Sequence, residues 1–156
     1  MKKFYVTLLL LVTALAVSAA AVQAQGKAKT GPDPSLIRDA ELEKDSLHNL
    51  EVARHYFKLK KAYVAAIKRC EEIDIANPTF TKMDEVLFIA GESSLRLAES
   101  RGKQQTKDKT PEQLRLEACV YLSRLVADYP DSTFFKQAET DLQALGGPIK
   151  PEGSKP

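Results

Sequence analysis

The stretches YVAAIKRCEEIDIANP (residues 63–78) and RLEACVYLSRLVADYP (residues 115–130) carry the same sparse pattern, which decides the fold class. In each, a small Ala is followed by apolar residues four and seven positions later and by a Pro twelve positions later. Positions spaced by four and seven share one helix face, and the Ala lets a second helix approach that face closely. The Pro ends the helix. The pattern predicts the second helix of a helix–turn–helix unit that occurs twice, as in helical repeat proteins.

Helical periodicity extends outward from these stretches over most of the chain. The expected helices cover residues 34–60, 62–76, 84–100, 111–128 and about 133–145. No stretch outside the N-terminal apolar run alternates like a β-strand. The fold class is therefore predicted to be all-α, with about five helices. The apolar stripe of the first helix is expected to contain Leu47, Leu50, Ala53 and Phe57, widened by Val52, Tyr56 and Leu59.

Three local signals refine the helix ends and contacts. Thr110, Pro111 and Gln113 are spaced as a capping box with Pro in the first turn. Asp131 or Ser132 is expected to cap the last helix. Gly91 lies inside the third helix, where Gly is typical of a close helix crossing.

The N-terminus has the composition of a secretory signal peptide. Two lysines precede an apolar run from Leu8 to Ala21, and Val22-Gln23-Ala24 is a small-residue cleavage site. This small-residue end favours cleavage over retention as a membrane anchor. The predicted organisation is a signal peptide (1–24), a flexible leader (25–34), a helical repeat domain (35–146) and a disordered tail (147–156).

The charge balance and the positions of the cysteines argue against nucleic-acid binding and against a lipid anchor. The chain has 23 basic and 21 acidic residues, and removal of the two N-terminal lysines leaves the numbers equal. Nucleic-acid binding is therefore not expected. No Cys lies near the cleavage site, so a direct lipid anchor is not expected either. Cys70 and Cys119 either form a disulfide, as exported proteins permit, or pack as two small buried thiols.

Catalytic motifs are missing from the sequence. It contains no Gly-rich phosphate loop, no nucleophile elbow and no recognisable pair of catalytic carboxylates. His48 and His55 are separated by about 10 Å along a helix, which is too far for both to bind one ion unaided. The chain is expected to be no enzyme and to hold no cofactor or metal. A small metal-binding protein that uses these two histidines is kept as a rival hypothesis.

The repeated pattern resembles the second half of a tetratricopeptide repeat, and the preceding helices supply the first half. The segment LEVARHYF (50–57), followed by YVAAIKR (63–69), is similar to the opening repeat of the BamD family of outer-membrane assembly factors. The segments 91–93 and 126–132 fit later repeats of that family. The resemblance covers roughly residues 33–145 and implies a right-handed superhelical stack of about two repeats plus a capping helix.

The resemblance also implies a binding surface, because the first helix of each repeat lines the concave groove. A polar protein or peptide partner with a few apolar anchors suits such a groove. Phe88 is the predicted apolar anchor. The alternatives are a solvated helix face or one covered by residues 25–45. The groove positions are His48, Glu51, His55 and Lys58 in one repeat, and Glu85, Phe88, Glu92 and Leu95 in the other.

The functional expectation is an exported, periplasmic adaptor, peripheral at the outer membrane, that assists assembly of outer-membrane β-barrel proteins. One rival is a different envelope scaffold, linked to Tol-Pal or peptidoglycan. Another is a repeat that self-associates as a homodimer through the open end of its stack. The polar segment 101–109 is expected to be a solvated connector, with a docking loop for an acidic partner as the alternative.

Overall fold

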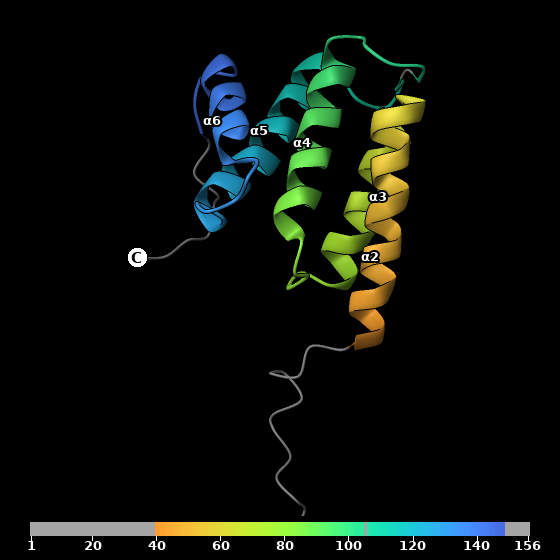
Figure 1. Cartoon of the computed structure of the whole chain (residues 1–156). Coiled ribbons are helices and arrows are strands. Elements are labelled where there is room, and N and C mark those ends of the chain that lie inside the picture. Colours follow the sequence, from red (N-terminus) through yellow and green to blue (C-terminus); the bar gives the residue numbers. More distant parts are fainter. Residues whose placement is uncertain (1–39, 105, 149–156) are drawn as a thin grey trace, which may run out of the picture. The chain divides into compact units, whose positions relative to one another are not determined.

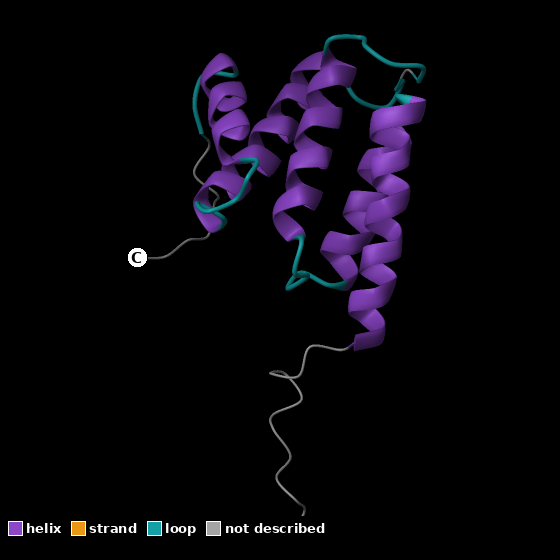
Figure 2. Cartoon of the chain, viewed as in Figure 1, coloured by secondary structure: helices purple, strands orange, loops and turns teal. Residues whose placement is uncertain are grey.

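The computed structural model describes residues 40–104 and 106–148, and every regular element in this part is helical (Figures 1 and 2). The predicted all-α fold is confirmed. Among these helices, none has the length and apolar character needed to cross a bilayer. The elements are α2 (Ala40–Arg54), the π-helical turn η2 (His55–Lys60), α3 (Tyr63–Ala76), α4 (Met83–Ala98), α5 (Pro111–Asp128) and α6 (Phe135–Ala144).

Several predictions fall outside the described residues. These are the signal peptide, the flexible leader, the start of the first helix before Ala40 and the tail from residue 149 onward. Gly147, which the prediction assigned to the tail, is bound to the fold. Its N–H donates to the Leu142 carbonyl at 2.8 Å, and its carbonyl accepts from the Cys119 thiol at 3.3 Å.

The helices pack as a series of neighbours along the chain. α2 packs on α3, α3 on α4, α4 on α5 and α5 on α6, and α2 also touches α4 (Figure 1). The core lies between successive helices and includes the two alanines of the repeated pattern, Ala66 and Ala118, both fully buried. The apolar residues that follow them at the predicted spacing, Cys70, Ile73, Leu122 and Leu125, are buried as well.

The close helix crossing predicted at Gly91 is confirmed. A Cβ atom added to Gly91 would lie 2.7 Å from Cγ of Leu122 and 3.5 Å from the Ala118 carbonyl oxygen, both on α5. Real Cβ contacts are almost never as short as 2.7 Å, so only Gly permits this spacing between α4 and α5. The crossing thus pairs the Gly of one helix with the small Ala of the repeated pattern on the next.

The start of α5 matches the prediction, whereas the start of α6 does not. Thr110 caps α5: its hydroxyl accepts from the Gln113 N–H at 3.3 Å, and the Gln113 side chain accepts from the Thr110 N–H at 2.8 Å. In α6 the N-cap position is Phe134, without a side-chain cap. Ser132 instead forms a tight turn before the helix, because its hydroxyl accepts from the Phe134 N–H and donates to Asp84.

The π-helical turn at the end of the first helix was not predicted. It ends at Lys61, which has a left-handed backbone conformation with φ of 51°. Hydrogen bonds from residue i to i+5 move the residues that follow out of a 3.6-residue register. Phe57 is still buried, but Leu59 is 71% exposed, so its predicted place in the apolar stripe is wrong. Leu47 is also exposed.

Cys70 and Cys119 are buried free thiols, which agrees with the packed-thiol alternative. Burial raises the pKa of the Cys70 thiol far above its ordinary value, and the nearby Glu71, Glu85 and Asp74 carboxylates add to this effect. A thiol held protonated in this way is a poor nucleophile.

Candidate functional site

The predicted groove residues of the first repeat lie exposed on one helix. His48 and Glu51 belong to α2, and His55 and Lys58 belong to the π-helical turn that continues it. These four residues are called the α2 face below. Because His55 and Lys58 lie beyond the start of the π-helical turn, the 3.6-residue register used to predict their direction does not apply to them.

Glu85, the first predicted groove residue of α4, is bound by Arg54 of α2. The guanidinium contacts both carboxylate oxygens, with Nε–Oε1 at 2.6 Å and Nη2–Oε2 at 2.5 Å. The hydrogen bond from Arg54 holds the pKa of Glu85 below its ordinary value, and burial opposes this effect. Glu85 therefore joins α4 to α2.

Phe88, the predicted apolar anchor, is stacked within the fold. Its ring centroid lies 4.6 Å from that of Phe134, which precedes α6, and the two planes are 19° from parallel. Phe88 is half-buried and packs against the core. The prediction of an open anchor site at Phe88 did not anticipate this intramolecular partner.

Glu92 is buried, and its side chain is only 9% exposed. Its carboxylate accepts from Arg96 at 2.8 and 3.1 Å. Burial and the facing Asp141 of α6 nevertheless raise the pKa of Glu92, because together they outweigh Arg96. The guanidinium of Arg96 also lies over the Phe57 ring, 4.4 Å from its centroid. Glu92 thus links α4 to α6, and its partner Arg96 contacts the π-helical turn.

The two halves of the predicted site consequently differ. Leu95, the last predicted residue of α4, is half-buried, and the three before it are engaged by α2 or α6. The α2 face remains exposed. The structure places all eight residues on α2, η2 and α4, but only the α2 face offers freely accessible side chains for a partner.

The part of the chain that the structure describes contains no group of three or more His, Cys, Asp or Glu side chains arranged to hold a metal ion. His48 and His55 both lie exposed on the α2 face.

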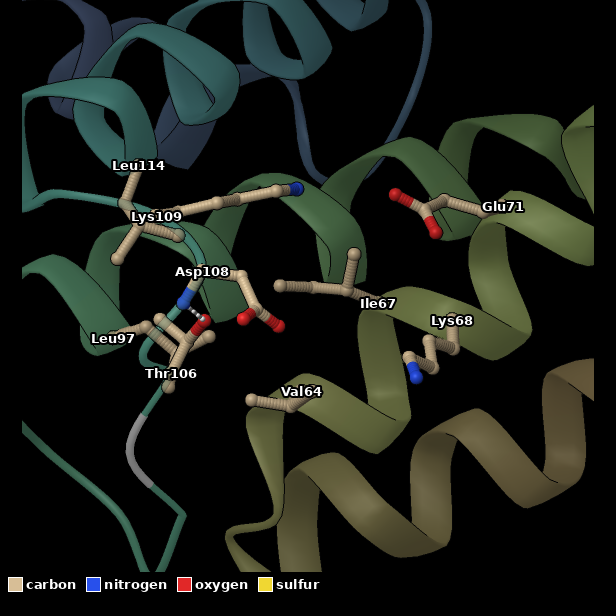
Figure 3. Close-up of a pocket in the computed structure, with 9 residues that line it drawn as sticks. All are labelled: Val64, Ile67, Lys68, Glu71, Leu97, Thr106, Asp108, Lys109 and Leu114. Atoms are coloured by element: carbon tan, nitrogen blue, oxygen red, sulfur yellow. Dashed lines mark hydrogen bonds between the residues drawn. The ribbon is translucent and has the colours of Figure 1, made fainter.

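A cavity of about 100 Å³ lies elsewhere, between α3, α4, α5 and the connector that precedes α5 (Figure 3). Figure 3 shows Val64 and Ile67 of α3 facing Leu97 and Leu114 across it. Charged and polar side chains surround this apolar lining: Lys68, Glu71, Thr106, Asp108 and Lys109. Pockets for small-molecule ligands are usually about 300–1,000 Å³, so this cavity suits a single apolar side chain better than a cofactor.

The connector that borders the cavity is fixed to neighbouring elements at several points. The Lys103 N–H donates to the Lys61 carbonyl at 3.0 Å, and the Gln104 side chain accepts from the Ala65 N–H at 3.3 Å. Lys109 forms an ion pair with Glu117 at 2.5 Å. Gly102 packs so tightly on the Tyr63 ring that an added Cβ would lie 2.6 Å from it.

Sequence reasoning missed this cavity. Val64, Ile67, Leu97 and Leu114 look like ordinary core positions of three separate helices, and only folding brings them together. The polar segment 101–109 was the one available signal, through its alternative interpretation as a docking loop.

Comparisons with known proteins found no matching family model, no matching curated protein and no matching solved structure. The proposed function therefore rests on the geometry of this chain and on the resemblance of its sequence.

Proposed function

We propose that this chain is an exported, non-catalytic adaptor with a tetratricopeptide-like stack of helices. It binds a segment of another protein through the exposed α2 face, on the side formed by α2, α4 and α6. The observation that carries the proposal is the difference in accessibility between the α4 residues and the α2 face on this side. The α4 residues are fixed by contacts with α2 and α6, whereas the α2 face stays exposed.

Packing between successive helices supports a repeat-like arrangement. In a helical repeat each unit contacts its neighbours, and the first helices of successive units lie side by side. Here Arg54–Glu85 joins α2 to α4, and Phe88–Phe134 joins α4 to the start of α6. These two contacts support the proposed assignment of α2, α4 and α6 as the first helices of three successive units.

The chemistry of the α2 face supports a protein partner. It combines two imidazoles, a carboxylate and an ammonium group along about three turns of helix, without a metal cluster or reactive thiol. Such a face suits directional hydrogen bonds to an extended or helical segment. From the sequence resemblance, the proposed setting is assembly of outer-membrane β-barrel proteins.

A photo-crosslinking experiment in intact cell envelopes tests this proposal. The photo-reactive residue replaces Glu51, because replacement of Phe88 would break its stacking with Phe134. A matched control carries the same residue in place of Leu116, which is 57% exposed on α5. We expect adducts with components of the β-barrel assembly machinery, or with unfolded barrel proteins, from the Glu51 position and not from the control.

Other outcomes separate the parts of the proposal. Adducts with Tol-Pal or peptidoglycan-linked proteins would preserve the adaptor function but overturn the role in barrel assembly. Adducts with only a second copy of this chain, or equal yields at both positions, would overturn the adaptor function.

A further inference from the structure

The fold gathers basic side chains at one end of the helices, although the numbers of basic and acidic residues in the chain nearly balance. At one end, the end of η2 and the α4–α5 connector carry exposed cations: Lys60, Lys61, Arg101, Lys103, Lys107 and Lys109. The hydrogen bond from Lys103 to Lys61 joins these two segments. This end is called the basic end below. The other end, near the start of α2 and the α5–α6 turn, mixes exposed acids with exposed lysines: Glu41, Asp45, Asp128 and Asp131 with Lys44, Lys82 and Lys136.

Helix dipoles do not explain the basic end. Cations near a helix C-terminus commonly offset its partial negative charge. However, η2 and α4 end here whereas α3 and α5 begin here, so the two pairs of dipoles oppose one another. Two acids at this end already form ion pairs with local cations: Glu99 with Arg101 at 3.2 Å, and Glu117 with Lys109 at 2.5 Å. Lys61, Lys103 and Lys107 remain as surplus exposed charge.

The apolar cavity opens within this basic end. Its apolar lining comes from Val64, Ile67, Leu97 and Leu114. Its rim carries Lys68 and Lys109 together with Glu71 and Asp108, so the excess positive charge comes from the lysines further along the connector and from Lys61. A negatively charged segment would be attracted by the surrounding lysines, and one apolar side chain would fill the cavity.

We propose that the basic end binds an acidic peptide segment that inserts one apolar side chain, such as Leu, into the cavity beside Val64. The surface differs from the α2 face, so this inference goes beyond the proposed function and does not depend on it. Charge complementarity supplies the attraction, and the size of the cavity selects a single side chain over an extended apolar face. A flat anionic membrane would use the lysines without the cavity.

The test uses fluorescence anisotropy with the whole mature chain and a fluorescein-labelled peptide, Glu-Asp-Glu-Leu-Asp-Glu. A second probe has Ser in place of Leu, and a third has amides in place of the carboxylates. We expect binding of the first probe and weaker binding of both others. Raising the salt concentration from about 0.1 to about 1 M shortens the Debye length from about 10 to about 3 Å and should weaken binding.

Two pairs of variants locate the site. Lys103→Glu with Lys107→Glu should weaken binding about tenfold, because attraction becomes repulsion at two exposed positions. Lys44→Glu with Lys136→Glu, which changes the net charge equally elsewhere, should have little effect. Val64→Gln should weaken binding about fivefold by making the lining polar. The matched Val52→Gln variant on α2 should leave binding unchanged, and circular dichroism checks that every variant folds.

Three results would overturn the inference. One is the absence of peptide binding. Another is equal weakening by the two lysine pairs, which would indicate non-specific attraction. The third is binding to phosphatidylglycerol vesicles that depends on Lys103 and Lys107 but not on Val64, which would assign the basic end to a membrane. None of these results affects crosslinking from Glu51, so failure here is distinguishable from failure of the proposed function.

Discussion

The rings of Phe88 and Phe134 stack with their centroids 4.6 Å apart, which fixes the start of α6 against α4. Removal of either ring should lower the free energy of unfolding by about 1–3 kcal/mol, since both are only half-buried. A double-mutant cycle with Phe88→Ala and Phe134→Ala in urea should reveal a coupling of about 0.5–1.5 kcal/mol. The same cycle with Phe135→Ala in place of Phe134→Ala should show no coupling. Additivity of the first pair would contradict the stacking.

Gly91 and Leu122 set the distance between α4 and α5. Ala is a better helix former than Gly by about 1 kcal/mol, but the added Cβ would meet Leu122 Cγ at 2.7 Å. Gly91→Ala should therefore destabilise the fold by about 1–3 kcal/mol. In a Leu122→Ala background the same substitution should cost little or should stabilise, because the obstructing side chain is gone. Urea unfolding of the four proteins decides this, and equal costs in both backgrounds would contradict the crossing.

The Arg54–Glu85 pair predicts a loss of stability in acid. Because the folded state lowers the pKa of Glu85, the stabilisation is fully present above its unfolded pKa of about 4.5 and is lost as pH falls through the lower folded value. Glu85→Gln should lower the free energy of unfolding at pH 7 by about 0.5–1 kcal/mol, since solvent screens this half-buried pair. Unfolding curves from pH 7 to pH 3 should show the difference shrinking. A constant difference would contradict the linkage.

For Glu92 we expect the opposite dependence of folding stability on pH. Its pKa is raised by burial and by Asp141, so its contribution is present below the unfolded pKa and is lost as pH rises through the folded value. Glu92→Gln should therefore match or exceed the natural protein in stability at pH 7, and the two should converge as pH falls. A clear loss of stability in this variant at pH 7 would show that the ion pair with Arg96 outweighs burial and Asp141.

Local sequence signals predicted the helices well. The spacing from Ala66 to Pro78 and from Ala118 to Pro130, and the capping box at Thr110, each depend on contacts within one helix or across one crossing. The Gly91 crossing was predictable for the same reason, since a Gly inside a helix needs a packing explanation.

Long-range relationships were not predictable from one sequence. Nothing near Phe88 indicates that Phe134, far along the chain, would cover it, and nothing near Glu85 indicates Arg54. Nothing near the π-helical turn indicates that Phe57, Tyr63 and Arg96 would meet in space. Likewise, near-equal totals of charge do not indicate that the fold brings lysines at the end of η2 and in the α4–α5 connector to one end of the helices.

A crosslinking scan over the surface tests the central claim, that this chain binds a protein segment through the α2 face. Photo-reactive residues at His48, Glu51, His55 and Lys58 are compared with the exposed positions Glu72, Leu116 and Glu139 on α3, α5 and α6. We expect one protein partner to be recovered from the α2 positions, with a yield that drops sharply at the other three. Equal yields from all helices, or adducts confined to the other three positions, would contradict it.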